Sequence, residues 1–168
     1  VTLGGGGTND TIDINASVTA GGALTIQNAD VVDLAASVDL TGAGVSVSSG
    51  INSINLSGAT GTTNTIASTG DANTVTITSV SATNSPNLTL RSDGDLTVSN
   101  IDIGTTGTLS ATTDFNNNGI NTLAVHGGLN AGPITLSGGG TNDTIAINND
   151  VVANGVLLIQ NAAFLDLA

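Results

Sequence analysis

The chain has 168 residues and a formal net charge of −12, because it contains 13 Asp, no Glu, no Lys and a single Arg. This acidic balance argues against nucleic acid and anionic membrane surfaces as partners. No Cys is present to build a disulfide framework, and no apolar run approaches the roughly 18 residues that a membrane-spanning helix needs.

Half of the residues are Gly, Thr, Asn or Ser, in counts of 23, 26, 20 and 15. Residues suited to turns and pleated strands therefore dominate over strong helix formers, and we expect an all-β chain. Val, Ile, Leu and Phe together make 46 residues, about 27% of the chain. Chains stay disordered below a share of about 20%, so this chain should fold around an aliphatic and thin core.

One pattern recurs along the chain: two aliphatic residues separated by a single small or polar residue. Alternation with a period of two turns both aliphatics to one side of a strand and the central residue to the other. Each triplet therefore predicts a short strand with an apolar inside and a polar outside. In chain order the triplets are 12–14, 24–26, 32–34, 38–40, 45–47, 54–56, 75–77, 88–90, 96–98, 101–103, 123–125, 134–136, 145–147 and 165–167.

The spacing of the triplets predicts the fold. Between residues 24 and 54 they start 6 to 9 residues apart, which leaves room for a turn but not for a helix. Three strands then take 21 or 22 residues. We expect a parallel β-helix (β-solenoid), right-handed, with three short strands per coil of about 20–22 residues and coils stacked about 4.8 Å apart.

Tandem β-sandwich modules are the alternative fold, since they also combine short strands with frequent turns. The absence of Trp and Tyr and the brevity of the strands disfavour it. Segment 104–122 fits the triplet pattern poorly. We expect it to bulge from a coil as a loop, with Asn118-Gly119 as its turn.

The chain repeats itself: residues 134–168 match residues 1–35 without a gap, at an offset of 133, with 23 identities in 35 positions. Inward aliphatics are kept between the two copies, whereas changes such as Asp13/Ala146 gather at outward or turn positions. We expect 1–133 to be one complete unit of about six coils, rising about 29 Å. Residues 134–168 would begin the next unit of a longer tandem array, with no separate globular domain.

These features resemble the giant β-solenoid surface proteins of bacteria. The shared features are aliphatic–polar–aliphatic strands, Asn/Gly turns, coils of about 20 residues, long internal repeats and no Cys. That group includes filamentous-haemagglutinin-like and autotransporter-type adhesins and related β-strand-repeat proteins. The resemblance implies a secreted, elongated stalk or fibre at the cell surface, which projects binding ends or builds extracellular material.

A glycine-rich motif occurs once in each copy, at 5–12 and at 138–145. It is similar to the calcium-binding nonapeptide G-G-x-G-x-D-x-U-x, in which glycine carbonyls and an Asp carboxylate hold the ion. Asp10 and Asp143 would occupy the Asp position and are the candidate metal ligands. Thr8 and Thr141 replace a glycine of that pattern, and the motif lacks consecutive copies. A glycine-rich turn between coils is the alternative.

Two further groups are candidate sites. Arg91 stands beside Asp93 and Asp95, which resembles the carboxylate and base pairs of carbohydrate-processing β-helices. The alternative is a plain turn, Asp93-Gly94-Asp95, between two strands. His126 is the only His, and with no Cys or Glu in the chain it cannot complete a usual zinc site.

Outward positions suggest surface roles. Residues 74–78 (TVTIT) place three Thr on one side of a strand, as in ice-binding solenoids, although β-propensity alone explains Thr in strands. Acidic residues occupy the middle of several triplets and would line the outside, where they keep fibres apart or bridge them loosely through divalent cations. These acids are Asp13, Asp33, Asp39, Asp102 and Asp166.

The sequence thus predicts a non-enzymatic structural or adhesive segment of a long secreted protein that forms an extracellular filament, stalk or adhesin shaft. Its expected partners are neighbouring copies of the same repeat, covalently continuous or end to end, with surface glycans or divalent cations as further candidates. No cofactor is required, and calcium is the one candidate ion. The alternatives are a carbohydrate-binding or carbohydrate-processing β-helix and a calcium-dependent surface repeat protein.

Overall fold

A computed structural model describes residues 1–7, 9–47, 50–70 and 72–168. Within these ranges the chain forms 20 β-strands and no helix. Every pairing between described strands is parallel. The expected parallel β-solenoid is therefore confirmed, and the alternative of antiparallel sandwich modules is wrong.

The strands lie on three faces. The first face holds β1 (Thr2–Gly4), β4 (Leu24–Gln27), β7 (Val45–Val47), the start of β10 (Val75–Ala82) and of β12 (Leu96–Asp102), β14 (Thr122–Val125), β17 (Thr144–Ile147) and β20 (Phe164–Leu167). The second face holds β2 (Thr11–Ile14), β5 (Val31–Leu34), β8 (Ser53–Leu56), the ends of β10 and β12, β15 (Leu129–Ala131) and β18 (Val151–Ala153). The third face holds β3 (Val18–Thr19), β6 (Asp39–Gly42), β9 (Thr63–Ser68), β11 (Asn87–Arg91), β13 (Leu109–Thr112), β16 (Ile134–Ser137) and β19 (Leu157–Gln160).

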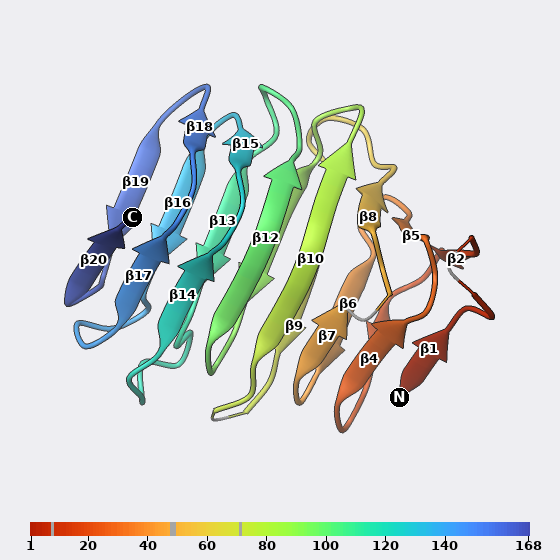
Figure 1. Cartoon of the computed structure of the whole chain (residues 1–168), viewed down its shortest axis with the longest axis horizontal. Coiled ribbons are helices and arrows are strands. Elements are labelled where there is room, and N and C mark those ends of the chain that lie inside the picture. The colour runs from red at the N-terminus through yellow and green to blue at the C-terminus, as the bar shows by residue number, and fades with distance from the viewer. Residues whose placement is uncertain (8, 48–49, 71) are drawn as a thin grey trace.

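The chain makes about seven coils, one for each of the seven strands of the third face. β10 and β12 run through the first and second faces without a break, which joins those two faces into one sheet. Figure 1 shows the coils side by side along the long axis, from β1 at one end to β20 at the other, with strands of the third face behind. Each strand is therefore paired to the coil before it and to the coil after it, and only the end coils have an open side.

Coil length varies more than the sequence suggested. Coils can be compared through one in-register series on the first face, which consists of Leu3, Ile26, Val47, Ile77, Val98, Val125, Ile147 and Leu167. The longest coils run from Val47 to Ile77 and from Val98 to Val125. These two carry extra residues between strands, among them 57–62 and 113–121. Because such insertions lie at the corners of the coil, they leave the register of the faces intact.

The core is the predicted row of inward aliphatics. Ile26, Leu34, Leu40 and Val47 are all fully buried, as the triplet pattern requires. The inward Val, Ile and Leu residues of the later coils are also buried as far as Ile147. Full burial of each such side chain contributes about 1.5–3 kcal/mol. The largest fully buried side chains are Leu24, Ile26, Leu34, Leu40, Ile54, Leu56, Ile66, Ile77, Leu88, Leu90, Leu96 and Ile101.

Some strands do not fit the triplet pattern because one of their inward residues is small or polar. Asn64 takes an inward place in β9, Ala111 in β13 and Ala131 in β15, and all three are buried. The expectation that 104–122 is a loop is accordingly wrong for its middle, where β13 lies. Residues 104–108 and 113–121 lie outside the strands as expected, and the second segment contains Asn118 and Gly119.

The repeat offset spans a definite number of strands. Fifteen strands, β1 to β15, precede β16, and β10 and β12 each count twice because they cross two faces. One repeat offset therefore contains 17 strand segments, which is five and two-thirds coils. On a coil spacing of about 4.8 Å it rises about 27 Å.

Candidate functional site

Buried polar side chains gather along one edge of the solenoid, here named the third corner. It consists of the last residues of β9, β11, β13 and β16 and the turns that follow them, where the chain passes from the third face to the first. The buried polar residues among those described are Asn64, Ser68, Ser92, Asp93, Thr113, Asp114, Ser137 and Asp143. All except Asn64 belong to this corner, so it holds most of the buried polar side chains of the described residues.

The three buried carboxylates of the third corner accept hydrogen bonds from backbone amides. Oδ2 of Asp93 accepts from the amide of Gly70 at 2.7 Å. Oδ1 of Asp114 accepts from the amides of Asn118 at 3.0 Å and of Gly119 at 3.2 Å. These charge-assisted bonds fix turns whose amides have no strand partner.

Asp143 does the same with both of its oxygens. Oδ1 accepts from the amide of Asn121 at 2.8 Å, and Oδ2 accepts from the amide of Gly140 at 3.0 Å. The carboxylate therefore ties the glycine-rich turn of its own coil to the loop of the coil before it. These two bonds stabilise the glycine-rich turn, in keeping with the alternative interpretation of the motif.

Hydroxyl groups complete the third corner. Oγ of Ser68 donates to the carbonyl of Asn73 at 2.9 Å and accepts from the amide of Asp93 at 3.0 Å. Oγ of Ser92 donates to the carbonyl of Asp95 at 2.8 Å, and Oγ1 of Thr113 donates to the carbonyl of Gly94 at 2.7 Å. Each hydroxyl serves the backbone of a turn, which is a structural task.

The structure separates the two candidate metal ligands. Asp143 is buried at the third corner, whereas Asp10 is exposed between β1 and β2, at the corner of the first and second faces. Thr8, in the first motif, lies outside the described residues. Among the described residues no group of three or more His, Cys, Asp or Glu side chains could hold a metal ion. Calcium binding through glycine carbonyls and one Asp stays a prediction.

Arg91 lies close to the third corner but faces an aromatic ring. Its guanidinium carbon is 4.7 Å from the centroid of Phe115, whose side chain is 53% exposed. A cation over an aromatic face at this distance is attracted by the ring quadrupole. Asp95, the other half of the suspected carboxylate pair, accepts a hydrogen bond at Oδ1 from the amide of Thr122 at 2.8 Å. Asp93 and Asp95 are thus both engaged with backbone amides.

His126 lies in the turn between β14 and β15, and its Nδ1 is 3.3 Å from Nδ2 of Asn148 in the next coil. A hollow of about 310 Å³ on the outside of the third corner is lined by Ala72, Asn118, Gly119, Ile120 and Asn121. None of these lining residues is acidic, basic or nucleophilic. This hollow therefore offers no evident acid, base or nucleophile for catalysis.

The second face carries a ladder of carboxylates and amides that the sequence did not reveal. Nδ2 of Asn55 donates to Oδ1 of Asp33 at 2.7 Å, and Nδ2 of Asn130 donates to Oδ1 of Asp102 at 2.9 Å. Nδ2 of Asn154 then donates to Oδ1 of Asn130 at 3.0 Å. The expected acidic stripe is therefore interrupted by amides that bridge one coil to the next. The sequence signal that could have predicted this ladder is an Asp followed by an Asn one coil later, as in Asp33/Asn55 and Asp102/Asn130.

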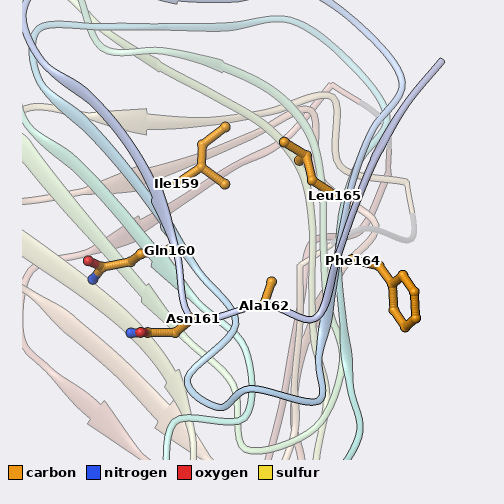
Figure 2. A pocket seen from close by; sticks show the side chains of 6 residues that line it. All are labelled: Ile159, Gln160, Asn161, Ala162, Phe164 and Leu165. Carbon is orange, nitrogen blue, oxygen red and sulfur yellow. The ribbon is translucent and has the colours of Figure 1, made fainter.

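The C-terminal coil presents an open apolar end. Figure 2 shows Ile159 of β19 and Leu165 of β20 extending into a hollow between these two strands, while Phe164 points away from it. The hollow measures about 300 Å³ and is lined by Ile159, Gln160, Asn161, Ala162, Phe164 and Leu165. Leu157, Leu165 and Leu167 are inward residues of the triplet pattern, yet all are exposed here. This end therefore exposes to solvent the kind of residue that earlier coils bury.

No family model matches this chain, and neither a curated protein nor a solved structure matches it. Among the described residues there is no helix of the length and apolarity needed to cross a membrane. The fold therefore defines the class, an acidic parallel β-solenoid with a long internal repeat.

Proposed function

We propose that this chain is a structural, non-enzymatic segment of a long secreted repetitive protein, serving as an extracellular filament, stalk or adhesin shaft. The observation that carries the proposal is the unbroken stack of about seven parallel coils around one aliphatic core, in a chain whose residues 134–168 repeat residues 1–35. Stacks of this kind lengthen by the addition of similar coils. The partner of this segment is then a neighbouring copy of the repeat.

The distribution of polar groups supports a mechanical role. The carboxylates and hydroxyls of the third corner are engaged with backbone groups of turns, and the amide ladder of the second face links successive coils. Continuous rows of hydrogen bonds run along the axis, and an aliphatic core fills the interior. Such an arrangement resists stretching along the axis and forms a shaft whose length grows with the number of coils.

The surface chemistry supports an exposed, extracellular location. A net charge of −12 favours solubility and discourages lateral sticking. A single Arg and no Lys leave one site for trypsin-like proteases. Antibodies against this chain should label intact producing cells; labelling that requires permeabilised cells would overturn the location.

The carbohydrate-processing and carbohydrate-binding alternatives have less support. The chain has two Phe and no Trp or Tyr. Phe115, near the suspected carboxylates, has its ring beneath the guanidinium of Arg91. A sugar would have to displace that cation in order to stack on the ring. A glycan panel and a lyase assay with calcium test both alternatives, and binding or cleavage in either would favour them.

Chains of one, two and three repeat units (residues 1–133), each ending in a further copy of residues 1–35, test the proposed shaft. Small-angle X-ray scattering and electron microscopy should show a rod that lengthens by about 27 Å per unit at constant width. Separate beads joined by linkers would contradict the proposal. The rod should also be resistant to protease along its whole length.

A further inference from the structure

The two copies of the repeat form the same strands on different faces. At an offset of 133, β1, β2, β3, β4 and β5 correspond to β16, β17, β18, β19 and β20. β1 lies on the first face and β16 on the third; β2 lies on the second face and β17 on the first. Every strand of the second copy is displaced by one face relative to its counterpart.

Part of the local structure is unchanged by this displacement. Asn28 and Asn161 are equivalent, and their φ angles are 57° and 54°. The amide of Asp30 donates to the carbonyl of Asp10 at 2.8 Å, and the equivalent bond from Ala163 to Asp143 also measures 2.8 Å. The repeat thus reproduces its strands and this turn while it occupies another side of the solenoid. The glycine-rich turn differs, because Asp143 is buried and its equivalent Asp10 is exposed.

Strand counting explains the displacement. One offset contains 17 strand segments. Five full coils of three strands use 15 of them, and the remaining two move the start of the next copy to a different face. A later copy can therefore begin on the same face only after three offsets, which is 17 complete coils. With coils about 4.8 Å apart, that distance is about 82 Å.

We propose that a tandem array of this repeat displays the same outward side chains on its three faces in rotation, so that the shaft has no dedicated binding side. The proposal rests on the proposed function, since it concerns an array. Any one kind of turn returns to the same side of the shaft only every third unit, about 82 Å further along the axis.

The described residues already show the effect at equivalent positions. Asp13 lies outward on the second face, in register with Asp33. Its equivalent, Ala146, lies outward on the first face, between Ala124 and Asp166. The glycine-rich turn likewise moves from the corner that holds Asp10 to the third corner. A partner that recognises one unit would therefore meet the next unit turned away.

Cysteine pairs in the 168-residue chain test the displacement, because the native chain has no Cys. Neighbouring strands place Cα atoms within the roughly 4.4–6.8 Å that a disulfide spans. Ala124→Cys/Ala146→Cys and Asn130→Cys/Val152→Cys should cross-link on mild oxidation, as should the control Thr25→Cys/Ser46→Cys. Asn130→Cys/Ala146→Cys should not. The displacement would be overturned if the Asn130/Ala146 pair cross-linked and the Ala124/Ala146 and Asn130/Val152 pairs did not.

A chain of three units, each with Ile120→Cys labelled by a small gold cluster, tests the array. Ile120 is 79% exposed, the highest value among the large hydrophobic side chains of the described residues, so the label should leave the core intact. Labels should lie on three different sides of a rod, at intervals of about 27 Å along its axis. A rod with all labels on one side would overturn this inference and leave the proposed shaft standing. Beads on a string would overturn both.

Discussion

Residues 24–34 and 157–167 have closely similar sequences and the same strands, yet they differ in exposure to solvent. Leu24 and Leu34 are 0% exposed, whereas their equivalents Leu157 and Leu167 are 44% and 66% exposed. The difference lies in the next coil: β7 covers β4 and β8 covers β5, while β19 and β20 carry no further strand among the described residues. The triplets therefore specify strands and turns locally, and burial comes from the neighbouring coil.

The largest effect should come from truncating an inward leucine in the covered coil. Leu34→Ala should lower the free energy of unfolding by about 2–5 kcal/mol, because it leaves a cavity in a packed core. Leu167→Ala, the same change at the equivalent exposed site, should cost less than about 1 kcal/mol. Urea unfolding followed by circular dichroism measures both. Equal losses at the two sites would refute the covered-versus-open comparison.

A second test adds to the C-terminal end the coil that covers the equivalent strands in the first copy. A copy of residues 36–56 appended after Ala168 supplies strands equivalent to β6, β7 and β8, which cover β3, β4 and β5 in the first copy. In that extended chain Leu167→Ala should cost about 2–5 kcal/mol, like Leu34→Ala.

Hydrogen exchange provides the second readout of the extension. Amides of β19 and β20 should exchange more slowly in the extended chain than in the original one. The matched control carries the same added segment with Ser at its inward aliphatic positions. This control has the same length but lacks the apolar side chains that would pack against β19 and β20. Equal protection in the extended chain and the control would show that added length, and not covering, is what matters.

A medium effect should separate the two candidate metal ligands. Asp143→Ala removes a buried acceptor of two amide hydrogen bonds and should cost about 1–3 kcal/mol. Asp10→Ala, at the exposed equivalent position, should change stability by no more than about 0.5 kcal/mol. Thermal unfolding in a calcium-free buffer measures the difference. A larger loss at Asp10 would reverse the assignment of the two residues.

Calcium should act, if it binds, through the exposed copy of the motif. At a concentration ten-fold above its dissociation constant, a ligand that binds only the folded chain stabilises it by about 1.4 kcal/mol. Calcium should therefore raise the melting temperature of the native chain and leave that of Asp10→Ala unchanged. The same rise in both chains, or no rise in either, would remove Asp10 as a ligand. Magnesium at equal ionic strength is the control.

The smallest effect should come from the outward amide ladder. Asn55→Ala removes a part-buried hydrogen bond to Asp33 and should cost less than about 1 kcal/mol. Asn64 is the matched inward asparagine: its Nδ2 donates to the carbonyls of Ala35 and Val38 at 2.8 and 2.9 Å. Asn64→Ala should cost more, because it leaves those acceptors unpaired inside the core. A greater loss from Asn55→Ala would show that the ladder, and not the interior, holds the coils.

The sequence sufficed for the fold because the triplet pattern is local. Alternation of aliphatic and polar residues decides the inside and outside of a strand, so Ile26 and Val47 were placed correctly. It failed where an inward residue is not a large aliphatic, as at Asn64 and Ala111, since those strands look like loops. The displacement of the second copy depends on the number of strands in one repeat. It could not be predicted, because strands with a small or polar inward residue were missed.

The site was less predictable than the fold. Asp93 has the sequence context of an ordinary solvent-facing turn residue in Asp-Gly-Asp, yet it is buried and accepts a hydrogen bond from an amide of the preceding coil. Its partner, Gly70, is 23 residues away, and only the coil length brings the two together. Contacts of this kind follow from stacking and not from any local motif.

X-ray diffraction from an aligned film of the three-unit chain tests the central claim most directly. If strands run across the shaft and coils stack along it, the reflection near about 4.8 Å lies on the meridian, parallel to the long axis. We expect that result, with the intensity growing as units are added. The same reflection on the equator, from strands that run along the axis, would contradict the stacked-coil shaft.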